Sequence, residues 1–347
     1  MNLFRLILLP ISLLYGAVLW TRNRLYDAGL LKSSRGDLRT IVVGNLSLGG
    51  TGKTPHTLAI LKNLNSQGIK VALLSRGYGR VSRGFKWVET EAVASQVGDE
   101  PLLIKKRLPQ IPVAVCENRL QGIAEIKKHN PEIEWVVLDD SFQHRGLKGD
   151  IYILLSEFNK PFFKDWTLPT GFLRDHKGEW KRAHTIIATK SPEVLTSAEK
   201  EAWKSKAVGA KSIPVYFSRI SYGLPVHVFD GSLLESKPDI SLGLAAIAHP
   251  QAFENHLRDH FSLKKFKSYP DHYLFNTQDI ALLKKDFDTF TGPLKVILTT
   301  EKDAARLREH NELKNLPIYF IPIEIEVEDA DGKDWMTWLK TSMANVK

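Results

Sequence analysis

Residues 44–55 read GNLSLGGTGKTP and decide the fold of this chain. The β-branched run Thr40–Val43 precedes them and predicts a strand, and Thr57–Leu64 follows with the character of a helix. Strand, glycine-rich loop, Gly-Lys-Thr and helix form the phosphate-binding P-loop arrangement. Glycines let backbone N–H groups turn toward phosphate oxygens, and the helix adds its positive N-terminus. The stretch therefore predicts a nucleotide-binding α/β domain.

The loop gives each of its residues an expected role. We expect Lys53 to reach the β- and γ-phosphates of ATP and the Thr54 hydroxyl to bind Mg²⁺. Ser47 stands where the pattern G-x-x-x-x-G-K-[ST] has its first glycine, so Gly49 and Gly50 are expected to supply the flexibility. The alternative is a glycine-rich turn that only caps a helix. The expected ATP contacts are Ser47, Leu48, Gly49, Gly50, Thr51, Gly52, Lys53, Thr54 and Pro55.

Composition limits the class of protein. The 347 residues suffice for two domains of about 100–200 residues each, and 43% hydrophobic with 25% charged residues is ordinary for a globular protein. A single cysteine, Cys116, excludes an intrachain disulfide and fits a reducing cytosol. The net charge of +9 favours a polyanionic partner. Because no basic run is interleaved with aromatics, we expect a nucleotide or an anionic membrane rather than nucleic acid.

An uncharged apolar segment, Leu6–Trp20, lies near the start of the chain. As a helix its 15 residues cover about 22 Å, short of a bilayer core of about 30 Å. A signal peptide and a buried core helix are the alternatives. Trp20 and the basic flank with Arg22 and Arg24 favour a helix lying in the membrane interface, and we assign residues 1–39 to this segment.

The middle of the chain alternates strand and helix. Several strand candidates are short apolar runs without polar alternation, as expected for parallel strands buried on both faces. The pattern predicts a doubly wound, mostly parallel sheet over residues 40–213, with functional loops at the carboxyl ends of its strands. The candidates are Thr40–Val43, Lys70–Leu74, Val113–Val115, Trp135–Leu138, Ile151–Leu155 and Thr185–Ala188.

The last third predicts a second, smaller α/β domain. Pro214–Ile220 and Pro225–Asp230 alternate around Tyr222 and Gly223, which indicates a two-stranded hinge over residues 214–231. The smaller domain is then expected over residues 232–347. Its candidate elements are the strands Leu242–Ala248, Leu294–Thr299 and Pro317–Val327 and a closing helix Asp334–Met343.

Two loops carry glycines and charges after strands. LSRGYGR at residues 74–80 has two glycines and two arginines, Arg76 and Arg80, after a buried strand, which suits a loop contacting an anion or a surface turn with solvated charges. VGDEP at residues 97–101 opens a helix with Asp99 and Glu100, which could simply cap it.

Two further motifs carry groups suited to phosphate chemistry. LDDSFQHR at residues 138–145 ends an apolar strand in Asp139-Asp140, as a Walker B element does, and Gln143, His144 and Arg145 could orient a substrate. In LPTGFLRD at residues 168–175, Arg174 could neutralise a transferring phosphoryl group and Asp175 could hold it.

The order of the motifs resembles the tetraacyldisaccharide 4'-kinase family, the lipid A 4'-kinases of Gram-negative bacteria. The motifs that carry the resemblance are GNLSLGGTGKTP, LSRGYGR, VGDEP, LDDSFQHR, LPTGFLRD, AAIAHPQAF at 245–253, YPDHY at 269–273 and LTTEKDA at 298–304. The resemblance implies a membrane-associated kinase with a P-loop domain and a smaller domain joined by a two-stranded hinge. Its reaction moves the ATP γ-phosphate to the 4'-hydroxyl of tetraacyldisaccharide 1-phosphate. Ser141 departs from the usual glycine after the Asp pair, and Asp175 stands where the family often has Glu.

The resemblance also implies site residues and partners. The catalytic base falls on Asp99 and its partner on His272, with Lys53 and Arg174 as the catalytic cations. Expected Mg²⁺ ligands are Thr54, Asp139, Asp140 and Glu100, and expected substrate contacts are Arg76, Tyr78, Gln143, His144 and Asp175. The expected partners are the lipid substrate and the cytoplasmic face of an anionic inner membrane, without nucleic acid or an obligate protein partner.

The residues also allow two other functions. A P-loop NTPase switch or chaperone would hydrolyse nucleotide, and Ala188–Lys190 and Thr300–Asp303 faintly resemble the base-reading motif of GTPases. A soluble small-metabolite kinase would use the first helix as ordinary core. The group that accepts the phosphate, whether water or protein, a soluble metabolite or a lipid, distinguishes these two functions from the lipid kinase.

Overall fold

The computed structural model describes residues 7–271, 273–328 and 334–346. The chain divides into unit 1, made of Met1–Ile220 with Ile325–Lys347, and unit 2, made of Ser221–Glu324. The sequence placed residues 325–347 in the smaller domain, whereas they group with unit 1. The physical reason is α11 (Trp335–Ala344), which buries Trp335, Leu339 and Met343 in the main core of unit 1.

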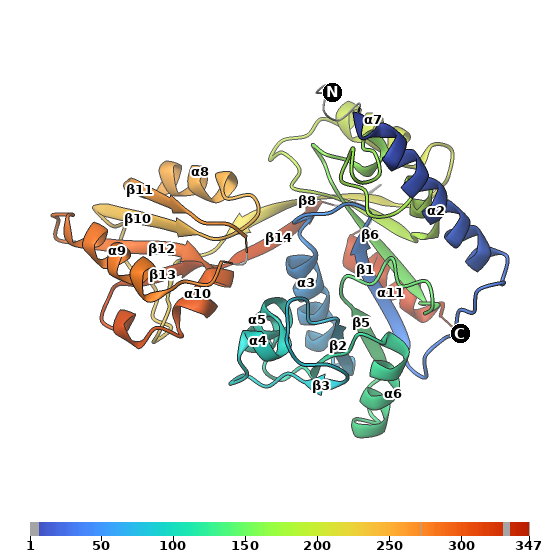
Figure 1. Ribbon diagram of the computed structural model, residues 1–347, viewed down its shortest axis with the longest axis horizontal. Coiled ribbons are helices and arrows are strands. Elements are labelled where there is room, and N and C mark those ends of the chain that lie inside the picture. Colours follow the sequence, from blue (N-terminus) through green and yellow to red (C-terminus); the bar gives the residue numbers. More distant parts are fainter. Residues whose placement is uncertain (1–6, 272, 329–333, 347) are drawn as a thin grey trace. The chain divides into compact units, whose positions relative to one another are not determined.

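Within the described residues, unit 1 contains a nine-stranded sheet in the order β14-β8-β7-β6-β1-β5-β2-β4-β3 (Figure 1). The strands from β8 to β4 in that order pair in parallel, and β3 pairs antiparallel with β4. The predicted doubly wound, mostly parallel sheet is confirmed. The strands are β1 (Arg39–Asn45), β2 (Val71–Ser75), β3 (Lys86–Trp87), β4 (Val113–Val115), β5 (Trp135–Leu138), β6 (Ile151–Glu157), β7 (Thr185–Thr189), β8 (Val215–Tyr222) and β14 (Ile323–Glu328).

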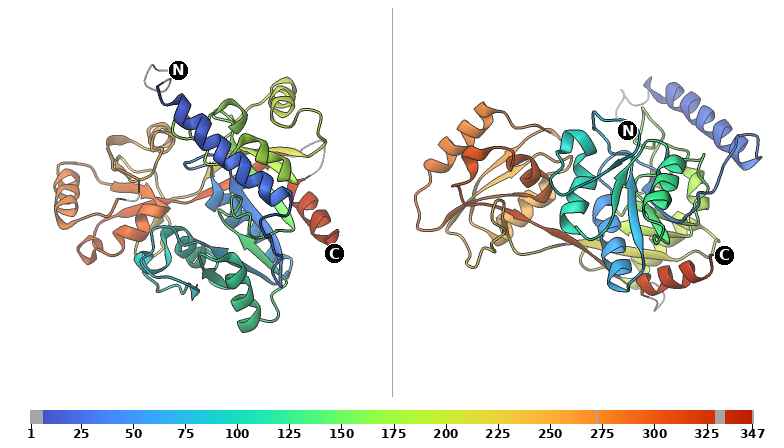
Figure 2. Two further views of the ribbon diagram at one scale, coloured as in Figure 1. Left: turned by 45° about the vertical axis from the view of Figure 1, so that its right-hand side comes forward. Right: turned by 90° about the horizontal axis from the view of Figure 1, so that it is seen from below.

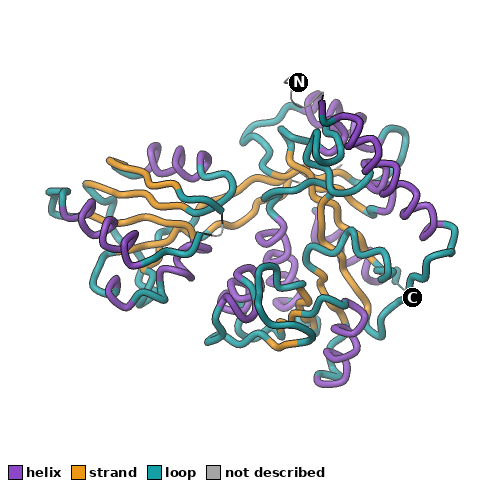
Figure 3. The backbone as a smooth tube through the Cα atoms, in the orientation of Figure 1, coloured by secondary structure: helices purple, strands orange, loops and turns teal. Residues whose placement is uncertain are grey.

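Both faces of this sheet are buried, which explains why its strands lack polar alternation. In β1, Ile41 and Val43 belong to one core cluster and Val42 to the opposite one, because successive side chains point to opposite faces. Full burial of each such side chain contributes about 1.5–3 kcal/mol. Figure 3 shows helices on both sides of the strands. α3 (Lys53–Ser66), α5 (Asp99–Arg107) and α11 supply one cluster, α6 (Arg119–His129) and α7 (Ser197–Val208) supply the clusters opposite, and α4 (Ala94–Val97) precedes α5.

Unit 2 has its own sheet and core. Its described strands follow the order β11-β10-β12-β13-β9, in which β9 alone is paired antiparallel. The predicted strand Pro317–Val327 is two strands, because Pro322 has no N–H for the ladder and separates β13 from β14. The elements are β9 (Val226–His227), β10 (Ile240–Ala245), β11 (Leu263–Ser268), β12 (Lys295–Thr300), β13 (Ile318–Ile321), α8 (Gln251–His260), α9 (Thr277–Asp288) and α10 (Glu301–Leu307).

The strands that pair at the hinge are not the two that the sequence predicts. β8 joins the large sheet beside β7, whereas β9 lies in the sheet of unit 2, so the two do not form a hairpin. The neighbour of β8 is β14, and these two strands cross the boundary between the units. The turn at Gly223 is not a hairpin turn because the Gly223 N–H donates to the Pro322 carbonyl at 2.9 Å. The pairing thus joins segments about 100 residues apart, which local alternation could not indicate.

The first described helix, α2 (Leu9–Asp27), lies along the outside of unit 1 in every view (Figure 2). No helix within residues 7–271, 273–328 and 334–346 has the length and apolarity needed to cross a membrane.

Candidate active site

The P-loop connects the end of β1 to the first residue of α3, Lys53. Gly49 has φ 104° and Gly52 has φ 82°, a left-handed backbone that a side chain would strain. Asn45, the last residue of β1, donates from Nδ2 to Thr51 Oγ1 at 2.7 Å. Strand, loop and helix therefore have the predicted order, and Gly49 supplies the turn as expected.

The LPTGFLRD segment packs directly on this loop. Ser47 forms an isolated antiparallel bridge with Leu173, and the Arg174 N–H donates to the Leu46 carbonyl at 2.9 Å. The bridge holds Ser47 in an extended pairing at the position where the P-loop pattern has glycine. These backbone contacts fix the position of Arg174 beside the P-loop.

Three charged side chains meet beside the P-loop. Arg174 donates from both terminal nitrogens to the Asp140 carboxylate and from Nη2 to Asn45 Oδ1 at 2.5 Å. Lys53 Nζ lies 3.8 Å from Asp140 Oδ1. Asp140 itself has φ 47°, a backbone uncommon for a residue with a side chain, which turns it away from the direction of β5. Two cations and one carboxylate thus gather where the P-loop would hold phosphates.

The two aspartates differ in their environments. Asp139 is buried, and it accepts a hydrogen bond from Thr57 Oγ1 at 3.1 Å. Burial, followed by the charges of Glu100 and Asp140, raises the pKa of Asp139 to about 7. Burial also acts to raise the pKa of Asp140, but the hydrogen bond from Arg174 and the charge of Lys53 outweigh it and lower that pKa. Asp140 is therefore the ionised member next to the cations, and Asp139 is the deeper one.

The VGDEP and LSRGYGR loops meet backbone to backbone. Gly98 has φ 93°, and a Cβ there would lie 3.1 Å from the Cα of Gly77, so both positions require glycine. Gly98 caps α5, which places Asp99 and Glu100 in the first helical turn, where acids are favoured by the helix dipole. The charge of Glu100 contributes to the raised pKa of Asp139.

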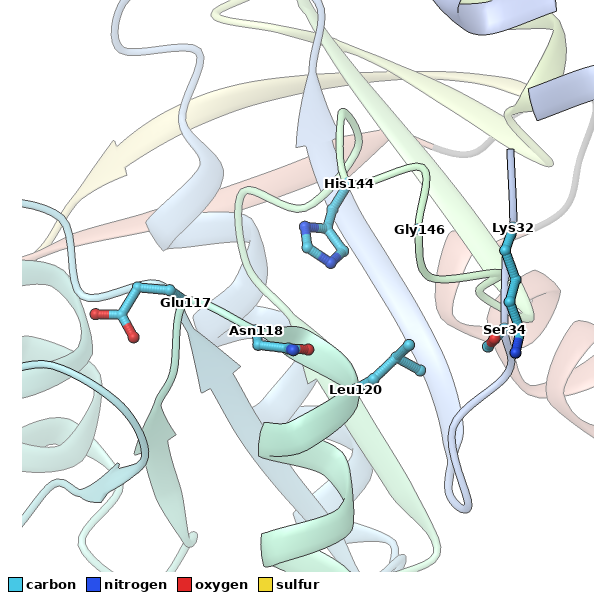
Figure 4. Close-up of a pocket in the computed structure, with 7 residues that line it drawn as sticks. All are labelled: Lys32, Ser34, Glu117, Asn118, Leu120, His144 and Gly146. Atoms are coloured by element: carbon cyan, nitrogen blue, oxygen red, sulfur yellow. The ribbon is translucent and has the colours of Figure 1, made fainter. Parts of the chain in front are cut away.

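The expected substrate residues have different positions. Arg76 and Tyr78 are exposed on the loop after β2, whereas Gln143 donates to the Asn45 carbonyl at 2.6 Å. His144 is half-buried, and burial, with the charges of Arg119, Arg22 and Arg76, lowers its pKa. It lines a hollow of about 550 Å³ in unit 1, shown in Figure 4. Lys32, Ser34, Glu117, Asn118, Leu120 and Gly146 line the rest of it.

Two interpretations of the sequence are wrong. Asp175 does not hold Arg174: it is fully buried and accepts from Asn23 Nδ2 of α2 at 2.8 Å. Arg145 is not presented to a substrate, because its guanidinium is buried between Glu179, at 2.7 Å, and Asp27. Both side chains are held by residues distant in the sequence, which the local motif could not reveal.

The sequence reasoning missed several residues that build the site. Asn45 and Thr57 flank the P-loop and hold Arg174 and Asp139, and their polar side chains at a buried strand end and on a buried helix face were the available signal. Arg119 opens α6 and donates from Nε to Ser141 Oγ at 2.9 Å. Burial lowers the pKa of Arg119 to about 10, although the charges of Asp139 and Asp140 oppose this.

Three remaining expectations concern the second catalytic residue and the rival motifs. His272 lies outside the described residues. In the Ala188–Lys190 segment, Lys190 is paired with Glu157. Asp303, in Thr300–Asp303, is fully buried and accepts from the Ala246 N–H at 2.9 Å, so it is not presented to a base. The faint likeness to a GTPase base-reading motif therefore has no structural counterpart in these two segments.

Comparison with known proteins gives one consistent result. The family model described as tetraacyldisaccharide-1-P 4'-kinase (LpxK) matches residues 4–344. The chain is 36% identical over 326 residues to the tetraacyldisaccharide 4'-kinase of Flavobacterium johnsoniae, covering 93% of each. It is 38% identical over 338 residues to that of Bacteroides thetaiotaomicron, covering 92% of this chain and 88% of the relative.

A solved structure agrees. LpxK from Aquifex aeolicus, crystallised in complex with ATP, has a TM-score of 0.74 and 29% identity to this chain, and the match covers 99% of both. From the full-length family match and these relatives, the chain belongs to the tetraacyldisaccharide 4'-kinase family.

Proposed function

We propose that this protein is a kinase that transfers the γ-phosphate of ATP to the 4'-hydroxyl of tetraacyldisaccharide 1-phosphate in lipid A biosynthesis. The observation that carries the proposal is the cluster of Lys53, Arg174 and Asp140 beside the P-loop. Phosphoryl transfer needs positioned charge more than covalent help, and this cluster supplies it. Membership of the family supports the lipid acceptor.

ATP would lie on residues 47–55, the glycine-rich loop that leads into α3, and the Aquifex aeolicus relative was itself crystallised in complex with ATP. The oxygen donors at that loop suit Mg²⁺: the Thr54 hydroxyl and a carboxylate of Asp139 or Asp140, with Glu100 as a further candidate. Among the described residues no three His, Cys, Asp or Glu side chains are grouped to hold a metal by themselves. In kinase sites Mg²⁺ usually takes one or two carboxylates together with phosphate oxygens and water. Bound there, Mg²⁺ would neutralise negative charge on the phosphates.

The residues of the chain would divide the remaining work. Lys53 and Arg174 would neutralise the charge that develops on the phosphoryl group. Asp99 would take the proton of the 4'-hydroxyl, with His272 orienting it. The hollow beside His144, with Lys32 at its rim, would receive part of the sugar–phosphate acceptor.

Helix α2 supports work at a membrane surface, because two of its three buried side chains are polar and many of its large apolar side chains are exposed. Its buried Ser12 donates to Thr170 Oγ1 at 2.7 Å, and its buried Asn23 bonds Asp175. Large apolar side chains point outward instead: Leu14 is 69% exposed and Val18 is 59% exposed. Exposed apolar groups followed by arginines suit an interface with anionic lipid. We propose that α2 lies on the cytoplasmic face of the inner membrane, where ATP is available.

The test is to incubate the protein with labelled ATP, Mg²⁺ and a lipid extract that contains the acceptor, and to ask what becomes labelled. We expect a lipid product whose formation requires Lys53. Label only in inorganic phosphate would favour an NTPase switch, and label in a water-soluble metabolite would favour a soluble kinase.

A further inference from the structure

His56 lies in the first turn of α3, between the P-loop and β8. Its side chain is buried, with 2% exposure, and both ring nitrogens have partners. Nδ1 is 2.7 Å from the Gly52 carbonyl oxygen, and Nε2 is 2.9 Å from Ser218 Oγ in β8. The ring therefore joins the residue before the P-loop lysine to a strand of the sheet.

In the neutral ring only one arrangement of protons satisfies both contacts. A carbonyl oxygen can only accept, so Nδ1 carries the hydrogen and donates to Gly52. The second nitrogen, Nε2, is then left with a lone pair. Nε2 then accepts, and the Ser218 hydroxyl donates to it. The serine thus fixes the tautomer, as the partner of the second nitrogen does for histidines elsewhere.

The contact to Gly52 acts on the peptide unit that Gly52 shares with Lys53. A trans peptide is planar, and its C=O and N–H point in opposite directions. When the ring holds the Gly52 oxygen, it also sets the direction of the Lys53 N–H. That N–H is among the first amides of α3, which lack helical partners and are the groups a P-loop turns toward phosphate. The Gly52 carbonyl also accepts the helical hydrogen bond of the His56 N–H at 3.2 Å, so the ring adds a second and shorter contact to the same peptide.

We propose that His56 is a positioning residue for the nucleotide: its ring holds the Gly52–Lys53 peptide so that the Lys53 N–H and side chain meet the phosphates. Ser218 keeps the ring in the required tautomer. The inference rests on the proposed ATP binding at residues 47–55 and does not depend on which acceptor receives the phosphate.

The test replaces His56 with Asn, Gln or Phe, which keep the hydrogen bond to Gly52, shift it toward Ser218, or remove both bonds. Asn at position 56 places its Nδ2 near the position of Nδ1 and can still donate to Gly52. Gln places its amide one carbon further, toward Ser218, and Phe keeps the volume without either bond. We expect His56→Phe and His56→Gln to raise the Kd for ATP about tenfold, the scale of one well-placed hydrogen bond, and His56→Asn to stay within about twofold.

The expected kinetic change lies mainly in KM for ATP rather than kcat, because the contact acts on ground state and transition state alike. Ser218→Ala should weaken ATP binding less than His56→Phe does. The matched control is Ser156→Ala, which removes another buried hydroxyl from the same sheet, one that accepts from the Phe162 N–H at 3.2 Å. Binding by Ser156→Ala should equal that of the wild type.

Two measurements keep the outcomes distinct. Thermal unfolding of each variant is recorded, and Kd is measured on folded protein by calorimetry. Equal affinities for the Asn and Gln variants, or losses that simply follow the fall in Tm, would overturn the positioning role. Lys53→Ala serves as the reference: if its turnover equals that of the wild type, the proposed function fails. If Lys53→Ala loses turnover while His56→Phe keeps wild-type affinity for ATP, only this inference fails.

Discussion

Arg174 holds the Asp140 carboxylate with both terminal nitrogens of its guanidinium, Nη1 donating to Oδ2 at 3.0 Å and Nη2 donating to Oδ1. This two-pronged geometry is specific to arginine, because a lysine ammonium is a single point charge. The pair joins the LPTGFLRD segment to the end of β5, and Lys53 approaches the same carboxylate. The positive charge is therefore positioned before any nucleotide arrives.

Replacing Arg174 tests this geometry. Arg174→Ala should reduce kcat about 10²–10³-fold, the scale of a lost transition-state charge contact, and Arg174→Lys should recover little of it. Turnover with the lipid acceptor and ATP affinity are to be measured separately. Near-full recovery by the lysine variant would show that charge alone, without the fork, is sufficient.

Lys53→Ala should abolish most phosphoryl transfer while the fold remains, because Lys53 is partly exposed at the site rather than part of the core. We expect a loss of about 3 kcal/mol in transition-state stabilisation. Lys62→Ala is the matched control, since Lys62 is exposed on the same helix and should leave turnover unchanged. A folded Lys53→Ala protein with wild-type turnover would refute the assignment of the kinase site.

Acid should destabilise the protein partly through His56. Its pKa in the folded state is about 4, below the ordinary 6.5, so between these values the unfolded chain binds a proton that the folded state lacks. Its contribution to the free energy of unfolding is therefore complete above pH 6.5 and is lost as pH falls to 4, by on the order of 3 kcal/mol. In denaturant titrations at pH 7 and pH 4.5, His56→Asn should lose less stability than the wild type. Equal losses would contradict the neutral buried ring.

Helix α2 should bind vesicles through its outward apolar side chains. Leu14→Glu combined with Val18→Glu should abolish most sedimentation with anionic vesicles, because two charges would enter the interface and repel anionic lipid. Leu282→Glu is the control, since Leu282 is 54% exposed on α9. Vesicle binding that survives the double substitution would place the membrane contact elsewhere.

Asp99 and His272 are predicted to act together. Asp99→Ala and His272→Ala should each reduce kcat with little change in ATP affinity, and the double variant should be hardly worse than the poorer single. Asp99 also stands in the first turn of α5, so its removal has a helix-dipole cost of about 0.3–1 kcal/mol, which thermal unfolding monitors. Fully multiplicative losses in kcat would mean that the two residues act independently.

The sequence by itself determined the P-loop and the strands around it. The signals are local: Gly49 and Lys53 lie within eight residues of β1, and strands such as Val113–Val115 and Trp135–Leu138 have the predicted bounds. A parallel strand buried on both faces must be apolar along its length, so its composition reports its environment. The acidic pair at the end of β5 followed from the same logic.

Only the tertiary structure decided which side chains meet. Asp175 accepts a hydrogen bond from Asn23 of α2, and Asp140, not Asp175, is the acidic partner of Arg174. His56 follows the P-loop directly, but its role depends on Ser218, 162 residues later in the chain. β8 likewise lies next to β14 in the sheet rather than pairing with β9, the next strand in the sequence. Contacts across such separations are set by how whole elements pack on both faces of the sheet, and local patterns contain no information about that packing.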